Sequence, residues 1–486
     1  MGNKSIKSNI ILNVIRTCCS VIFPLITFPY VSRVLGAVNY GKVNFSNSIV
    51  SYFALLAALG ISNYAVREGA VLRNNKEKYN QFSNQIFTIN LISTCLAYIT
   101  LVITVCVSMF LRQYSLLIGI QSIAFAFTTL GVEWLYVTYE DYLYITLRSI
   151  SVQVLSLILT FTLVKTPDDY VKYAFITVLS TAGANFFNYV HSRQYITLRV
   201  TRIVNWKKHL KPIFILFCHA FITTIYVNSD MTILGFLAGD YSVGIYSVAV
   251  RIYTIVKQLL NSIISVVSSR CAFYYGNGEE EKYDELFCKV IKALLTLVMP
   301  AIVGIFMLSD SIIRVIAGEA YREGAIALRI LGIALGGATI ACAYVSLSLL
   351  VHRKDKECLK VTFISALLNV VLNLVFIPLG KQNGAALTTL MAEIIVLVGA
   401  IYYSRDDVKV TGIKRTLISC SIGCTSIVVV CLCVSVISNT ILQIAISCTV
   451  SAFVYFVLMI VLKNDVVLEG MGIVRNVLRK RRSDGV

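Results

Sequence analysis

Hydrophobic residues occur in this sequence as long runs separated by short polar stretches. A run of about 20 apolar residues is long enough to cross a bilayer as a helix. Each run is therefore predicted to be a transmembrane helix, and no stretch between the runs is long enough for a soluble domain. The fourteen predicted segments are 9–35, 42–65, 83–108, 115–137, 144–164, 173–190, 213–237, 244–268, 291–308, 325–351, 361–378, 385–403, 417–437 and 441–462.

Polar residues within the first two segments are arranged as stripes. When the first segment is placed on a helix, its polar residues fall within an arc of roughly 60°. A polar stripe that carries a charge has to face protein or water instead of lipid. The two segments are therefore predicted to line a hydrated cavity. The stripes consist of Asn9, Asn13, Arg16, Ser20 and Thr27 in the first segment and of Asn44, Ser48, Ser51 and Ser62 in the second.

The composition also indicates a membrane protein, since 57% of the 486 residues are hydrophobic and only 14% are charged. Soluble globular proteins have about 25% charged residues. A net charge of +18 suggests a nucleic-acid partner, but the Lys and Arg residues are distributed as in a membrane protein. If the N-terminus lies inside, the segments between helices on the inner side hold 29 Lys and Arg residues, and those on the outer side hold 7. Both termini are therefore predicted to be cytoplasmic. The basic tail 479–482 is expected to contact anionic lipid, and no nucleic-acid partner is expected.

The fourteen cysteines lie mostly within the apolar runs. The close spacing of Cys420, Cys424, Cys431 and Cys433 resembles metal-ligand spacing, but no cluster of histidines or carboxylates accompanies it. A metal site would need such ligands in a polar setting. We therefore expect small buried side chains here, with no metal and no cofactor.

An internal repeat relates the two halves of the chain. Residues 9–82 recur about 203 positions later, where Gly36 and Gly41 match Gly239 and Gly244. Six segments separate the copies, so both copies cross the membrane in the same direction, which is a parallel repeat. The predicted fold is an all-α polytopic membrane protein with about 14 transmembrane helices, in which two six-helix lobes are followed by two C-terminal helices. The predicted boundaries are 1–200 for the N-terminal lobe, 201–410 for the C-terminal lobe and 411–486 for the two extra helices and the basic tail.

Three stretches resemble the Wzx-type flippases of the MOP exporter superfamily, which also includes the MATE transporters. These stretches are Phe23–Gly36 with the following Tyr40-Gly41, Gly131–Tyr136, and Asn383-Gly384-Ala385-Ala386. The resemblance implies a multi-pass protein of the bacterial inner membrane. It would move a polyprenyl-diphosphate-linked oligosaccharide from the cytoplasmic to the outer leaflet by alternating access, for O-antigen, capsule or a related polymer. Expected partners are this substrate, membrane lipids, a polysaccharide polymerase and a chain-length regulator.

Charged residues within the predicted helices fall into two groups, those deep in the membrane and those near the ends of the segments. A charge at the middle of a bilayer costs at least about 2.5 kcal/mol, so a deep charge needs a partner or water. Charges near a segment end are interpreted as snorkelling side chains that reach the interface. The charges near segment ends are Arg33, Arg148, Lys292, Arg329 and Glu133.

The deeper charges and the polar stripes form the predicted site. Arg16, Arg251 and Lys257 outnumber Asp230, so these helices would attract an anion such as a diphosphate. The matched depths of Asp230 and Arg251 indicate either a structural ion pair or a role in gating, and His219 is either a titrating group or a hydrogen-bonded core residue. The predicted cavity residues are Arg16, Asn13, Ser20, Asn44, Ser48, Ser51, Arg251, Thr254, Lys257 and Gln258; those for gating or ion coupling are Asp230, His219 and Glu393; those of the cytoplasmic entrance are Arg67 and Arg270.

Two other functions compete with the flippase interpretation. A MATE-like antiporter for cations or drugs would share the fold, but it would be expected to carry acidic residues on the first polar stripes, where none is present. A membrane glycosyltransferase or polymerase would need a catalytic carboxylate or large loops outside the membrane, and the outside loop 309–324 is short. The protein is therefore not expected to be an enzyme.

Overall fold

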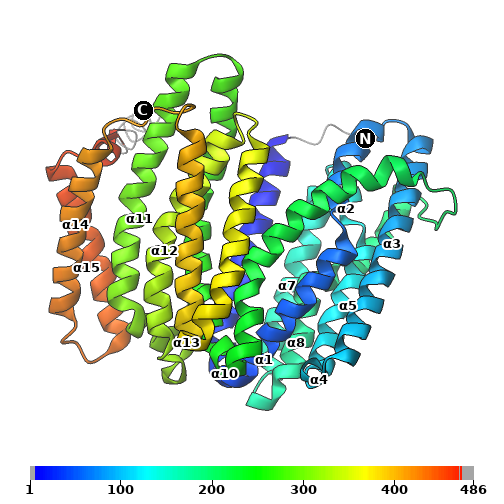
Figure 1. The fold of residues 1–486 in the computed structure, drawn as a ribbon, viewed down its shortest axis with the longest axis horizontal. Coiled ribbons are helices and arrows are strands. Elements are labelled where there is room, and N and C mark those ends of the chain that lie inside the picture. The colour runs from blue at the N-terminus through cyan, green and yellow to red at the C-terminus, as the bar shows by residue number, and fades with distance from the viewer. Residues whose placement is uncertain (1–5, 470, 473–486) are drawn as a thin grey trace, which may run out of the picture. The chain divides into compact units, whose positions relative to one another are not determined.

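The computed structural model describes residues 6–469 and 471–472, and every element that it assigns in this part of the chain is a helix (Figure 1). The basic tail 479–482 lies outside the described residues. The elements are α1 (Ile6–Ala58), α2 (Ile61–Leu72), α3 (Lys76–Val107), α4 (Met109–Arg112), α5 (Ser115–Gly131), α6 (Glu133–Thr138), α7 (Tyr142–Leu163), η1 (Pro167–Asp169), α8 (Tyr170–Val178), η2 (Leu179–Gly183), α9 (Ala184–His191), η3 (Ser192–Gln194), α10 (Trp206–Gly276), α11 (Glu280–Ala317), η4 (Glu319–Tyr321), α12 (Gly324–Tyr344), η5 (Val345–Leu349), α13 (Asp355–Ser404), α14 (Ile413–Val434) and α15 (Thr440–Val461).

Three of the longest helices are broken at one residue. The breaks lie at Gly36 in α1 (φ 69°), at Gly239 in α10 (φ 78°) and at Lys381 in α13 (φ 48°). Ten helices of the described residues are long and apolar enough to cross a membrane. The broken helices α10 and α13 each contain two predicted segments, and α1 contains segment 9–35 and most of segment 42–65. Segment 173–190 is covered by α8, η2 and α9 together. The predicted all-α polytopic membrane architecture is therefore confirmed.

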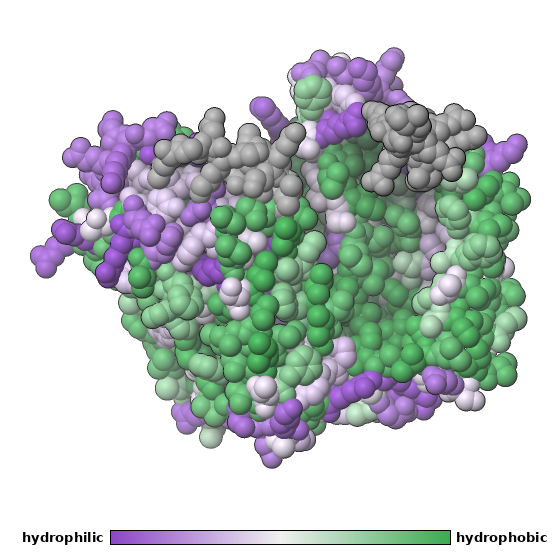
Figure 2. Space-filling view, turned by 180° about the vertical axis from the view of Figure 1, so that it is seen from behind, coloured by the Kyte–Doolittle hydropathy of each residue, from purple (hydrophilic) through white to green (hydrophobic). Residues whose placement is uncertain are grey.

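The surface has the hydropathy of a protein that spans a bilayer. On the face drawn in Figure 2, hydrophobic side chains cover the middle and hydrophilic side chains gather at the upper and lower edges. Polar groups can be hydrated only outside the hydrocarbon layer, which explains this division into bands.

The chain divides into two compact units, Met1–Gly244 and Ile245–Val486. The first unit extends beyond the predicted lobe boundary at residue 200, since the first half of α10 contacts α1 within this unit. There, the Thr232 hydroxyl donates to Ser48 Oγ over 2.9 Å. The lobe boundaries 1–200, 201–410 and 411–486 remain a prediction.

A buried aromatic cluster at one end of the first unit joins α2, α3 and α6. It includes Tyr64, Phe82 and Tyr136. His209, at the start of α10, is only 2% exposed and lies 2.8 Å from the Tyr64 hydroxyl and 2.9 Å from Gln85 Oε1. These two hydrogen bonds fix the start of α10 to α2 and α3.

The second unit is held together by hydrogen bonds between helices as well as by apolar packing. The hydroxyl of Tyr283 in α11 donates to the Leu347 carbonyl of η5 over 2.7 Å, and the hydroxyl of Tyr455 in α15 donates to the Thr296 carbonyl of α11 over 2.9 Å. In α13, Ser365 donates to the Ala392 carbonyl over 2.8 Å. A buried hydroxyl without a partner would be costly, so these bonds specify how the helices pack.

The two glycine turns of the repeat contact each other reciprocally. A Cβ atom at Gly41 would lie 1.8 Å from the Asp240 carbonyl oxygen, and one at Gly244 would lie 1.9 Å from the Ala37 carbonyl oxygen. Asp240 and Gly244 follow Ala37 and Gly41 by the repeat spacing of 203 residues. Only glycine permits such a close approach of two backbones.

Replacing Gly41 with alanine is expected to lower the midpoint of thermal unfolding of the purified protein. The new methyl group must displace backbone atoms of residue 240, and overpacking of this kind costs about 1–3 kcal/mol. Gly119→Ala is the matched control, because no heavy atom lies within 4 Å of the position of its Cβ. Equal midpoints for Gly41→Ala and the wild type would show that the turns do not pack in this way.

Candidate functional site

Three charged side chains meet in the first unit. Arg16 Nη1 in α1 donates to Glu133 Oε1 over 2.7 Å, and Arg148 Nη2 in α7 lies 3.6 Å from Glu133 Oε2. Val132 has a left-handed backbone (φ 37°) and separates α5 from α6, so Glu133 occupies the first turn of a new helix. We call Arg16, Glu133 and Arg148 the arginine cluster. It contains two positive charges and one negative charge.

The arginine cluster is partly open on one side and buried on the other. The side chains of Arg16 and Glu133 are 32% and 39% exposed, whereas that of Arg148 is 7% exposed. Arg148 Nη1 also lies 3.3 Å from the Ala184 carbonyl oxygen of α9. The interpretation of Arg148 as a snorkelling side chain is therefore wrong, because its guanidinium is held inside the unit.

Arg16 was identified from the sequence, but its partners were not. Glu133 and Arg148 lie near the ends of their predicted segments, and hydropathy alone does not distinguish a paired charge from a snorkelling one. Only the family resemblance points to the stretch Gly131–Tyr136 as a whole. Its first residue allows a close approach, since a Cβ at Gly131 would lie 2.5 Å from Cβ of Asn185 in α9.

The other predicted cavity residues of α1 differ in exposure. Asn13 and Ser20 are exposed, whereas Asn44 and Ser51 are half-buried and donate to backbone carbonyls of their own helix. Ser48 is 2% exposed and accepts the Thr232 hydrogen bond, so it packs between α1 and α10 in this structure. The assignment of these side chains to substrate binding stays a prediction.

In the second unit, two predicted site residues form an ion pair. Lys257 Nζ in α10 donates to Glu393 Oε1 in α13 over 2.7 Å, and the Tyr253 hydroxyl donates to the same oxygen over 3.0 Å. The Glu393 side chain is 6% exposed and that of Lys257 is 26% exposed. The positive charge of Lys257 is thus balanced by Glu393, which the sequence-based count of charges did not include.

The other predicted site residues of α10 differ in exposure and in the unit to which they belong. Arg251 and Thr254 are half-buried and Gln258 is exposed, all in the second unit. Asp230 is 6% exposed and belongs to the first unit, whereas Arg251 belongs to the second, so their ion pair stays a prediction. His219 is exposed.

The two arginines predicted to lie at the cytoplasmic entrance both have exposed side chains. Arg67 Nε lies 3.4 Å from Glu68 Oε1, and Arg270 Nε donates to the Tyr274 hydroxyl over 3.1 Å. Each guanidinium also lies over a tyrosine ring, with Arg67 6.0 Å from the centroid of Tyr64 and Arg270 5.5 Å from that of Tyr274. Both side chains are accessible to a ligand, and their role at the entrance stays a prediction.

A large apolar cavity lies in the second unit beside α11, α14 and α15. Its volume is about 1570 Å³. The walls include Leu297, Pro300, Ile427, Ala452 and Phe456. Such a lining suits a hydrocarbon chain and offers little to a polar ligand.

No group of three or more His, Cys, Asp and Glu side chains within residues 6–469 and 471–472 is arranged to hold a metal ion. The arginine cluster carries one surplus positive charge, and Lys257 and Glu393 form a balanced pair in the second unit.

Comparisons with known proteins place these features in context. The family model described as polysaccharide biosynthesis protein matches residues 6–268, and the MatE model matches residues 216–375. The chain is 25% identical over 410 residues to a protein of Escherichia coli K12 named "Putative O-antigen transporter", covering 83% of this chain and 97% of that protein. It is also 25% identical over 183 residues to a protein of Haloferax volcanii named "Probable low-salt glycan biosynthesis flippase Agl15", covering 37% and 38%.

Solved structures share the fold. A lipid II flippase, MurJ, in an inward closed conformation superposes with a TM-score of 0.72 at 18% identity, covering 94% of this chain and all of that chain. A multidrug-resistance MATE transporter in an inward-facing conformation superposes with a TM-score of 0.63 at 14% identity, covering 81% and 97%.

Proposed function

The chain belongs to the family of polysaccharide biosynthesis proteins, whose model matches more than half of its length, and on that premise we propose that it is a flippase for polyprenyl-diphosphate-linked oligosaccharides. The protein would carry the repeat units of a surface polysaccharide, such as O-antigen or capsule, from the cytoplasmic to the outer leaflet. The observation that carries the proposal is the surplus positive charge of the arginine cluster within apolar helices.

The charge of the cluster favours an anionic headgroup. Two guanidinium groups share one carboxylate, so hydrogen-bond donors of Arg16 remain for a ligand beside a partly exposed ion pair. Arginine binds phosphate oxygens with a planar set of donors, and the low dielectric of the surrounding helices strengthens the attraction. A cationic drug would be repelled, which makes the MATE-like antiporter the weaker alternative.

The apolar cavity supports the lipid part of the proposed substrate. A polyprenyl chain is a long hydrocarbon whose transfer out of water is favourable by about 25 cal/mol per Å² of buried surface. The cavity beside α11, α14 and α15 offers such a surface within the second unit. The prenyl chain can then remain in an apolar environment.

Several finer assignments belong to the same proposal. The protein would lie in the bacterial inner membrane with both termini in the cytoplasm, where Arg67 and Arg270 would mark the entrance. Asp230, His219 and the Lys257–Glu393 pair would couple transport to an ion gradient or act in gating. A polysaccharide polymerase and a chain-length regulator would be its functional partners, and the protein itself would catalyse no bond change.

The proposed function predicts the phenotype of a deletion strain. Without the gene, lipid-linked repeat units should accumulate in the inner membrane and the surface polysaccharide should be lost. The reason is that the later steps of polysaccharide assembly would take place on the outer side of this membrane. A plasmid with the wild-type gene should restore the polymer, as measured by gel electrophoresis of surface polysaccharide and mass spectrometry of lipid-linked precursors. Unchanged polymer and precursor levels in the deletion strain would contradict the proposal.

A further inference from the structure

A second, polar pocket lies in the second unit and shares no lining residue with the apolar cavity. The end of α10 and the start of α11 form a helical hairpin that extends beyond the neighbouring helices of this unit (Figure 1). Between this hairpin and residues 346–353 lies a pocket of about 910 Å³. Its polar lining side chains are Ser268, Ser269, Tyr275, Glu280, Ser346, His352 and Arg353.

We propose that this pocket binds a sugar unit of the oligosaccharide, an inference that rests on the proposed flippase function. Its volume falls within the range of small-ligand pockets, roughly 300–1000 Å³. The lining combines hydrogen-bond donors, acceptors and aromatic rings, which are the groups that a sugar hydroxyl and a sugar ring face can use.

The hydrogen bonding of His352 defines one acceptor in the pocket. Its Nδ1 lies 3.0 Å from the Ser348 carbonyl oxygen. A carbonyl oxygen can only accept, so Nδ1 carries the proton of the neutral ring and Nε2 is left as an acceptor. A hydroxyl group can donate to this nitrogen, whereas the oxygens of a fully ionised phosphate cannot.

Two opposite charges in the lining also select against simple ions. Among the residues that the structure describes, neither Glu280 nor Arg353 is part of an ion pair, so both remain for a ligand. The two charges sum to zero, so neither a phosphate nor a cation gains a net attraction from them. A neutral sugar donates hydroxyl hydrogens to Glu280 and accepts from Arg353.

Aromatic rings provide the apolar part of the pocket. The ring of Tyr275 packs on that of His352 with their centroids 4.2 Å apart and an angle of 49° between the planes. The weakly polar C–H face of a sugar ring can lie against such a surface, while its hydroxyls point toward the charged groups.

The pocket lies farther along α10 than the Lys257–Glu393 pair. Lys257 and Ser268 lie on the same helix, eleven residues apart. At 1.5 Å of rise per residue, this separation is about 16 Å along the helix axis. The pocket and the Lys257–Glu393 pair are therefore separate sites of the second unit.

The test is photo-crosslinking of the full-length protein in lipid nanodiscs. The probe is the oligosaccharide released by mild acid from the host's lipid-linked repeat unit, with a diazirine at its reducing end. We expect mass spectrometry to locate the label in residues 268–280 and 346–353, and unlabelled oligosaccharide to compete. His352→Ala and the isosteric Glu280→Gln, at an exposed position, should each reduce labelling about fivefold or more.

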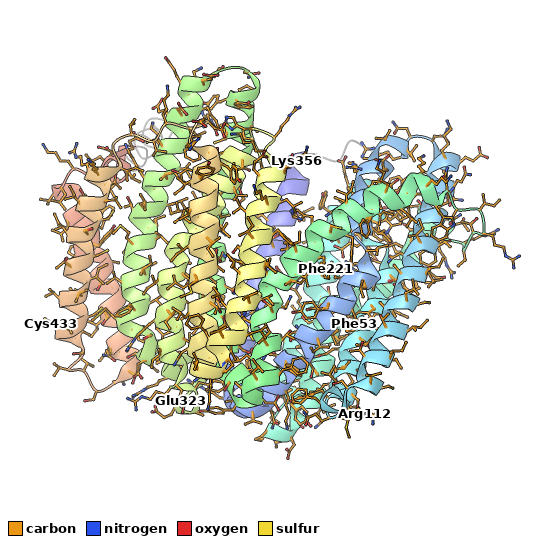
Figure 3. The ribbon with its side chains drawn as sticks, in the orientation of Figure 1. Phe53, Arg112, Phe221, Glu323, Lys356 and Cys433 are labelled. Carbon is orange, nitrogen blue, oxygen red and sulfur yellow. The ribbon has the colours of Figure 1, made fainter. Side chains whose placement is uncertain are left out.

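Lys356→Ala is the matched control, because this exposed lysine at the start of α13, labelled in Figure 3, does not line the pocket. The inference would be overturned by label elsewhere in the chain, by His352 and Glu280 variants that are labelled as strongly as the wild type, or by competition from inorganic pyrophosphate instead of sugar. Complementation by the wild-type gene separates the two proposals. If the gene restores surface polymer while the label maps elsewhere, only the sugar pocket is wrong; if it does not, the flippase function is wrong.

Discussion

Replacing Arg16 with alanine is expected to reduce transport of the lipid-linked oligosaccharide by about 10- to 100-fold. A hydrogen bond to a charged group contributes about 1.5–3 kcal/mol, and each 1.4 kcal/mol corresponds to a factor of ten. The substitution also removes the surplus charge, because Glu133 and Arg148 then balance each other. Surface polysaccharide in complemented cells and transport in proteoliposomes, both at equal protein amounts, measure the effect.

Glu133→Gln distinguishes anion binding from a merely structural ion pair. This variant keeps the size of the side chain and raises the surplus charge of the cluster, so substrate binding should be retained even if the protein unfolds at a lower temperature. For Arg16→Ala, the matched control is Arg405→Ala, which also removes an arginine but at a position where the side chain is 61% exposed. If Glu133→Gln loses transport as fully as Arg16→Ala, the cluster holds the helices together and does not bind the headgroup.

Replacing Lys257 with methionine is expected to destabilise the protein by about 3 kcal/mol. Removal of one partner leaves the other charge buried and uncompensated, which costs about 3–5 kcal/mol in buried pairs. Glu393 is 6% exposed and would keep only the Tyr253 hydrogen bond, whereas Lys257 is 26% exposed and can reach water when Glu393 is removed. Glu393→Gln should therefore be the milder change.

The double variant Lys257→Met with Glu393→Gln should be more stable than Lys257→Met alone, because no buried charge remains. Thermal unfolding in detergent measures all three proteins, and Lys356→Met controls for the loss of a lysine from the surface. Destabilisation that simply adds up in the double variant would show that the two residues do not interact.

The membrane helices could be predicted because hydropathy and the bilayer constrain each segment separately. The turns at Gly36 and Gly239 were placed correctly for a similar reason, since glycine and short polar stretches interrupt the apolar runs at the same spacing. The resemblance to Wzx-type flippases is confirmed by the family match and by the relatives. These signals are local, so they can be recognised in the sequence without knowledge of how the helices pack.

Partners distant in the sequence could not be predicted in the same way. Arg16 and Glu133 are separated by 117 residues, and Lys257 and Glu393 by 136. A polar stripe shows that a helix face is not in contact with lipid, but it does not distinguish a cavity from a contact with another helix. Ser48 illustrates this difference, because in the structure its side chain contacts Thr232 of α10 instead of facing a cavity.

The same limit applies to the pocket at the end of α10. His352 and Tyr275 lie in short polar segments between the predicted membrane helices, and their ring contact depends on how the hairpin folds back. No periodicity joins residues 268–280 with residues 346–353. Such a site becomes visible only when the two segments are placed in space.

The most direct test of the flippase function is transport by the purified protein in proteoliposomes. The measurement is the fraction of a fluorescent polyprenyl-diphosphate-linked oligosaccharide that a membrane-impermeant glycosidase can reach. We expect wild-type protein to make the inner-leaflet pool accessible, and Arg16→Ala vesicles to resemble empty vesicles. An accessible fraction that stays at the level of empty vesicles with wild-type protein, or that rises equally with Arg16→Ala, would contradict a flippase in which the arginine cluster binds the substrate.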